Sequence, residues 1–167
     1  VYRQGRTTTL QRWFGWLDDR GGIEKYPLNA MNAAFLAQTT GQPAQAERWA
    51  DAVDRWQDQD ASPPPDAYTE ATAATLRAQL LRRGAEQMRA DADEAARKFA
   101  AANFTVMVTP LLQGTARILC GDLDGADAFF STAESIDEHR QSSADILAIT
   151  LCERSLVAMA RNRWDQA

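Results

Sequence analysis

Hydrophobic residues recur every three to four positions along most of the chain. The first such stripe runs from Leu10 to Leu17 and ends at the Gly21-Gly22 pair, which is typical of a helix C-terminus. Because this spacing places the apolar side chains on one face of a helix, the pattern predicts an all-α protein. The other predicted helices occupy residues 27–40, 67–83, 85–101, 104–120, 122–138 and 143–160. One more follows Gly41 at once, with its apolar stripe from Ala46 to Trp56.

Short turns divide these helices into antiparallel pairs. Gly41, Gly84, Gly121 and Asn162 stand at the turns, at intervals of about 40 residues. An internal repeat of this length is typical of solenoids of stacked helix pairs. We therefore expect about three and a half helical hairpins. They occupy approximately residues 7–57, 67–101, 104–138 and 143–167.

Three consecutive prolines, Pro63 to Pro65, interrupt the helical pattern. Because proline cannot continue a helix, they favour an extended connector over residues 58–66, between two hairpins. Residues 1–167 are expected to form a single helical-repeat domain. The chain begins at Val1 rather than Met and stops at Ala167 within an amphipathic pattern, so we expect it to be a fragment of a longer protein.

The hairpin around Gly121 has small and aromatic residues at fixed distances from its turn. Gly114 lies seven residues before Gly121, whereas Ala126, Phe130 and Ala133 follow it by five, nine and twelve residues. This pattern resembles the tetratricopeptide signature. Small residues at a helix crossing allow two helices to approach closely, and the aromatic ring fills the space beside them. Within this hairpin, the first helix has an alternative start at Pro110, with Thr109 as its cap.

The other hairpins match this signature in part. The small residues on either side of the turn are present in the first and last hairpins: Ala34, Ala46, Ser155 and Ala167. In the first hairpin, Ala50 and Val53 replace the later aromatic and alanine. In the second, Arg77 and Arg89 stand where small residues are expected, so its register differs. The resemblance implies a right-handed superhelical solenoid of tetratricopeptide-like hairpins.

Three segments at the start of the chain contain a Gly-Arg pair before the first helix, a tryptophan-rich first helix and a later helix with the sequence Glu-Arg-Trp. They read YRQGRTTTLQRWFGWLDD, YPLNAMNAAFLAQTTG and QPAQAERWADAVDRW. Over residues 1–56 this text resembles the opening of the helical-repeat region in MalT-like, LuxR-family bacterial transcription regulators. The resemblance implies a STAND-type ATPase domain before this region and a LuxR-type helix-turn-helix after it. ATP and DNA would then bind to neighbouring domains only.

Charge and composition disfavour nucleic acids and membranes as partners of this chain. The chain has 18 basic and 23 acidic residues and a net charge of -5, which does not favour a nucleic-acid-binding face. No apolar run approaches the roughly 20 residues of a membrane-spanning helix, so no membrane partner is expected. Cys120 and Cys152 lie in apolar stretches and are expected to be reduced, buried thiols of a cytoplasmic protein.

No group of residues has the spacing that catalysis or metal binding requires. The sequence contains neither a phosphate-binding glycine loop nor a dinucleotide-binding one, and His139 is the only histidine. Asp122 and Asp124 resemble the start of a calcium loop, but the later ligands are absent, so Asp122 is expected to cap a helix. We therefore expect a non-enzymatic segment with no catalytic residues, no metal site and no cofactor of its own.

The candidate binding residues lie on the first helix of each hairpin, which usually lines the concave face of such solenoids. This face is apolar and would suit a small hydrophobic ligand or an amphipathic helix. The alternative is that these residues pack against one another in a closed superhelix. The candidates are Leu28, Met31, Phe35, Gln38, Leu111, Thr115, Ile118, Ile149, Cys152, Leu156 and Met159.

The tryptophans offer a second candidate surface. Trp13, Trp49 and Trp56 lie on apolar stripes and are expected to pack between helices, although they could stack on a ligand. Trp16 lies off the stripe and is expected to face solvent, a neighbouring domain or a ligand.

Together these features predict the sensor and interaction segment of a MalT-like, LuxR-family regulator. By resemblance, it would bind a small-molecule inducer or a regulatory protein and control self-association. The alternative is a free-standing tetratricopeptide-type scaffold that binds a protein partner and has no role in transcription.

Overall fold

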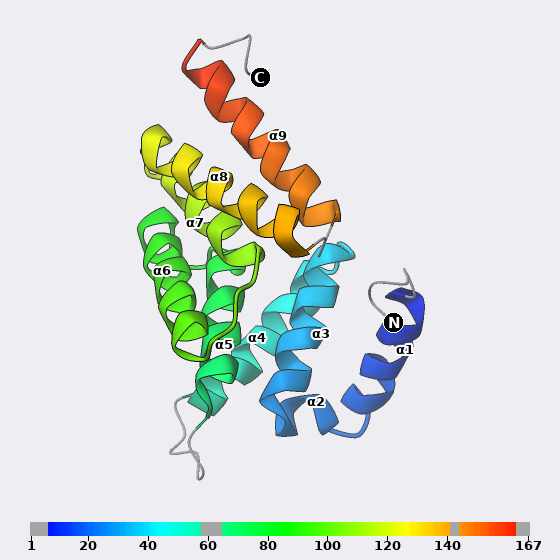
Figure 1. The fold of residues 1–167 in the computed structure, drawn as a ribbon. Coiled ribbons are helices and arrows are strands. Elements are labelled where there is room, and N and C mark those ends of the chain that lie inside the picture. Colours follow the sequence, from blue (N-terminus) through cyan, green and yellow to red (C-terminus); the bar gives the residue numbers. More distant parts are fainter. Residues whose placement is uncertain (1–6, 58–64, 141–143, 163–167) are drawn as a thin grey trace. The chain divides into compact units, whose positions relative to one another are not determined.

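The computed structural model describes residues 7–57, 65–140 and 144–162, and all regular secondary structure in these residues is helical (Figure 1). This confirms the predicted all-α class. The helices are α1 (Thr7–Asp18), α2 (Gly22–Lys25), α3 (Pro27–Thr39), α4 (Pro43–Gln57), α5 (Ala67–Leu80), α6 (Ala85–Ala101), α7 (Val108–Leu119), α8 (Leu123–Arg140) and α9 (Ala144–Ala160).

Two helix starts differ from the predicted ones. The four-residue helix α2 was not predicted, because it is too short to show a hydrophobic period. Helix α7 begins at Val108 rather than at residue 104, with Pro110 in its first turn, where a missing N–H is tolerated. Thr109 lies inside the helix and does not cap it, since Met107 occupies the cap position.

The predicted turn residues adopt the backbone conformation that such turns require. Gly41 and Gly121 have φ angles of 72° and 82°, and Asn162 has 55°. A positive φ is costly for most residues but accessible to glycine and asparagine, which explains the choice of residue at these helix ends. Asp122 accepts a hydrogen bond from the Gly125 backbone N–H at 2.8 Å, which confirms its predicted capping role.

The chain forms two compact units, Val1–Leu76 and Arg77–Ala167, with the boundary inside α5. In the first unit, α3 packs along α4, while α1 contacts α2 and α3. Alanines predominate in this core, together with Met31 from α3 and Trp49 and Val53 from α4.

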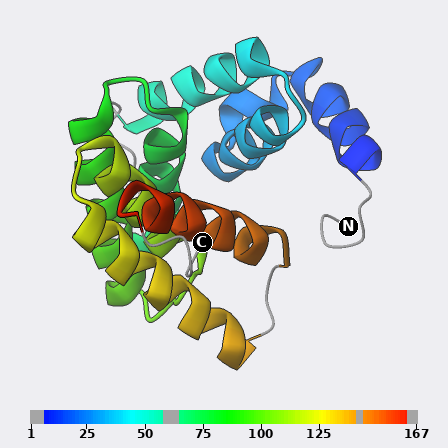
Figure 2. The same ribbon diagram turned by 90° about the horizontal axis from the view of Figure 1, so that it is seen from above.

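In the second unit, successive helices pack against each other in chain order. Helix α7 contacts both α6 and α8, and α9 contacts α8 and α7, so that α7, α8 and α9 lie side by side (Figures 1 and 2). One apolar cluster joins Ala78, Met88 and Ala92 to α7. A second cluster joins Leu111 of α7 to α8 and α9 and continues the core.

Candidate binding surfaces

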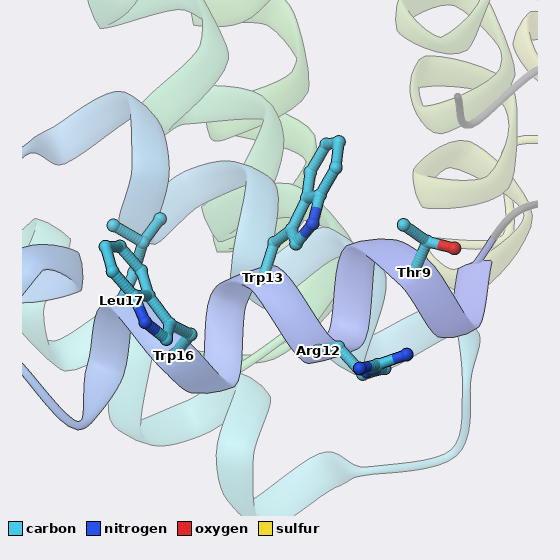
Figure 3. Close-up of a pocket in the computed structure, with 5 residues that line it drawn as sticks. All are labelled: Thr9, Arg12, Trp13, Trp16 and Leu17. Carbon is cyan, nitrogen blue, oxygen red and sulfur yellow. The ribbon is translucent and has the colours of Figure 1, made fainter.

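The outward side of α1 forms an open depression of about 650 Å³. It is lined by Thr9, Arg12, Trp13, Trp16 and Leu17 (Figure 3). All five line one stretch of α1: in Figure 3 the Trp13 ring and Thr9 extend above the helix, Arg12 extends below it, and Trp16 and Leu17 lie nearer its C-terminal end. The depression has the size of a pocket for a small organic ligand.

The opposite side of α1 fastens this helix to α3 and α4. Phe14 lines a small cavity of about 40 Å³ together with Leu36 and Trp49. At the helix end, the Asp18 carboxylate pairs with Arg48 and accepts a hydrogen bond from Trp49 Nε1 at 3.3 Å. These contacts hold one face of α1 and leave the tryptophan face open.

The chemistry of the open face is aromatic and cationic. Trp13 and Trp16 are 56% and 55% exposed, so the Trp13 ring and the face of the Trp16 ring that Arg20 leaves uncovered are available for stacking. The Arg20 guanidinium lies 4.1 Å from the centre of the Trp16 ring and donates a hydrogen bond to the Trp16 carbonyl at 3.1 Å. Together with Arg12 and the Thr9 hydroxyl, this face can hold a planar apolar ligand that carries an anionic or hydrogen-bond-accepting group.

The exposed position predicted for Trp16 is confirmed, but the packing predicted for Trp13 is wrong. Helix α1 has no fully buried residue. It contacts the neighbouring helices through the side that carries Phe14, so the apolar side that carries Trp13 is only partly covered. Trp49 is buried as predicted, and Trp56 is half-buried. Sequence reasoning therefore found Trp16 and missed its neighbours on the same face, although the spacing of Thr9, Arg12 and Trp16 indicates that they share it.

The other candidate positions differ in burial. In α3, Met31 is buried, Phe35 is half-buried, and Leu28 and Gln38 are exposed. These four residues belong to the first unit.

In α7, Leu111 is buried, and Thr115 and Ile118 are half-buried. Leu111 and Ile118 pack in one cluster with Ala126 and Phe130 of α8. In α9, by contrast, all four candidates are exposed: Ile149, Cys152, Leu156 and Met159.

Both cysteines are free thiols, and Cys120 is half-buried rather than buried as predicted. Burial, and then the nearby Glu86 carboxylate, raise the pKa of the Cys120 thiol. Cys152 is exposed, so the prediction that both cysteines are buried is wrong for this residue. Its helix face is apolar in sequence, and periodicity alone does not show whether another helix covers such a face.

Arg77 occupies the position in the second hairpin where the other hairpins have a small residue, and its contacts account for this difference. Its side chain donates a hydrogen bond to the buried Asp91 at 3.3 Å and another to Glu94 at 3.1 Å. Asp91 also accepts a hydrogen bond from Gln87 Nε2 at 3.2 Å. A polar contact therefore occurs between α5 and α6 where the other hairpins have small residues.

No protein-family model, curated protein or solved structure matches this chain. Within the residues that the structure describes, no three acidic, cysteine or histidine side chains gather in a way that could hold a metal ion. None of the described helices is both long and apolar enough to cross a lipid bilayer.

Proposed function

We propose that this chain is a binding module, the sensor and interaction segment of a MalT-like, LuxR-family regulator, and that its α1 face is the ligand site. The observation that carries the proposal is the pair of exposed indoles beside Arg12 and Thr9 around a depression of about 650 Å³. The indoles can stack on a planar ligand, and the guanidinium can pair with an anionic group on that ligand.

The helical hairpins supply the framework for this role. Ala34 and Ala46 lie seven before and five after one turn, Gly114 and Ala126 lie at the same distances from another, and all four are buried. This recurrence supports a helical repeat of the tetratricopeptide type, with hairpins that stack into a right-handed superhelix. As part of this proposal, ligand binding at α1 would change the self-association of the module.

The test uses a matched pair of dyes. 8-Anilinonaphthalene-1-sulfonate has a planar naphthalene ring and an anionic sulfonate, whereas N-phenyl-1-naphthylamine has the same rings without the sulfonate. Energy transfer from tryptophan reports binding of either dye. We expect Trp16→Ala to weaken both dyes by about tenfold. Arg12→Gln should weaken only the sulfonate by a few-fold, because it removes only the cation.

Tyr26→Ala is the control, since Tyr26 is also exposed but lies outside α1. Equal dye affinity in the wild type, Trp16→Ala and Arg12→Gln would refute the α1 site. Sedimentation velocity with and without the sulfonate dye then separates the two functions. A change in association state supports the sensor role, and binding without such a change supports a scaffold unrelated to transcription.

A further inference from the structure

One face of the Trp16 indole already carries a cation of the same chain. The Arg20 guanidinium lies over this ring, 4.1 Å from its centre, and donates a hydrogen bond to the Trp16 carbonyl at 3.1 Å. The Arg20 backbone N–H donates to the Leu17 carbonyl at 3.2 Å, so the main chain of Arg20 is also held at the end of α1. A cation is favoured at this helix end by the helix dipole. Arg20 is therefore fixed by the ring and by the main chain together.

The charge along the depression is positive as well. Arg12 precedes Trp16 by four residues, as Arg20 follows it by four, and Arg12 lines the depression. None of the described residues that line the depression is acidic. Asp18 pairs with Arg48 of α4. A ligand on the open side of α1 thus meets two aromatic rings and the charge of arginines.

Exposed tryptophans generally favour cationic ligands, because the face of an indole ring carries negative charge density. In the α1 site this attraction is already satisfied within the chain, since Arg20 occupies the cation position over Trp16. A second cation on the free face of the ring would be repelled by Arg20 and by Arg12. An anionic ligand is attracted by the same two charges.

We propose that Arg20 positions the Trp16 ring and sets the charge specificity of the α1 site, which binds planar aromatic carboxylates or sulfonates in preference to aromatic cations. This inference rests on the proposed function, because it narrows the ligand class of the same depression. The ligand ring stacks on the indoles, and its anionic group pairs with Arg12. Arg20 does not touch the ligand and acts through Trp16, as a positioning residue.

The test compares two ligands of opposite charge. 1-Naphthylacetate and 1-naphthylmethylammonium share one ring system and one methylene group, and they differ in the sign of the charged group. Displacement of N-phenyl-1-naphthylamine, the neutral dye, measures the affinity of each ligand for the full chain. We expect the wild type to bind the acetate at least about tenfold more tightly. The chain as a whole has a net charge of -5, so this preference opposes its overall charge.

Arg20→Gln removes the charge and keeps a side-chain N–H donor. It should weaken the acetate by about threefold and strengthen the ammonium ligand by about threefold, because the covered face of Trp16 becomes free for a cation. Opposite shifts are the signature of the proposed role, since a merely structural change in α1 would weaken both ligands. Arg20→Lys keeps a cation that can lie over the ring and should restore the preference for the acetate.

The control is Arg55→Gln, which removes the same charge from an exposed arginine of α4 in the first unit. Its ion pair with Glu24 is 3.5 Å long and exposed, so both affinities should stay unchanged. Acrylamide quenching gives a second readout that needs no ligand. The Trp16 signal is the difference between each protein and the same protein with Trp16→Phe. Quenching of this signal should increase in Arg20→Gln and not in Arg55→Gln.

The outcomes separate the inference from the site on which it rests. A wild type that binds neither the neutral dye nor the naphthyl ligands would refute the α1 site and the inference with it. If the dye binds and the two naphthyl ligands compete equally well, the site stands and the charge specificity is wrong. Parallel losses of both ligands in Arg20→Gln, or unchanged quenching of Trp16, would equally overturn the role of Arg20.

Discussion

Gly114 and Phe130 show how a single missing methyl group sets the distance between two helices. The Phe130 ring is fully buried, and its edge occupies the space that a Cβ on Gly114 would fill. Glycine inside a helix costs about 1 kcal/mol relative to alanine, so Gly114 lowers the intrinsic stability of α7. The close packing of α7 on α8 offsets this cost.

We predict that Gly114→Ala lowers the free energy of unfolding by about 1–3 kcal/mol, because the new Cβ forces the Phe130 ring or the helix to move. Gly15→Ala in α1 is the matched control, since nothing lies within 4 Å of a Cβ at that position. There, alanine should raise stability by about 0.5–1 kcal/mol. Urea denaturation measures both changes, and a gain in stability for Gly114→Ala would contradict the close contact.

The positions of the helices could be predicted from the sequence more completely than the solvent exposure of their faces. Periodicity and turn residues are local signals, so the predicted ranges agree with most helix ends, and Ala126 and Phe130 are buried as their spacing predicts. Exposure depends on what a helix packs against, which no local pattern contains. This is why Trp13 and Cys152, both on apolar stripes, are exposed, and why the proposed ligand surface of α1 was predicted only at Trp16.

Polar contacts supplement the apolar packing between α8 and α9. Arg154 donates hydrogen bonds to Asp127 at 2.9 Å and to Glu134 at 2.5 Å. The bond to Glu134, and then that to Asp127, raise the pKa of the Arg154 guanidinium. Arg161, the residue after α9, also pairs with Asp127, at 3.3 Å, so Arg154 and Arg161 share one carboxylate of α8.

We predict that Arg154→Met lowers the free energy of unfolding by about 1 kcal/mol, because the methionine keeps the apolar stem and removes the charged contacts. The loss should shrink in about 1 M NaCl, where solvent-accessible ion pairs are screened. Arg97→Met, at an exposed arginine of α6, serves as the control and should have little effect. An effect of Arg154→Met that is independent of salt would indicate that packing, and not charge, joins α9 to α8.

At the scale of the whole molecule, the division into two compact units predicts that a destabilising core substitution increases local unfolding only in the unit that contains it. Ala46 and Ala126 lie at equivalent positions, five residues after their turns, and both are buried. Ala46 belongs to the first unit and Ala126 to the second. The same alanine-to-tryptophan substitution can therefore be made at an equivalent position in either unit.

We predict that Ala126→Trp accelerates amide exchange in α7, α8 and α9 and leaves α3 and α4 protected. A large side chain at a close crossing forces the two helices apart and opens the contacts of its own core first. Ala46→Trp should give the reciprocal result, with faster exchange in α3 and α4 only. Hydrogen exchange followed by mass spectrometry resolves the helices separately. If either substitution speeds exchange equally in both units, the chain opens as one cooperative body, whereas unchanged exchange in α7 and α8 of Ala126→Trp would show that Ala126 does not lie at a close crossing.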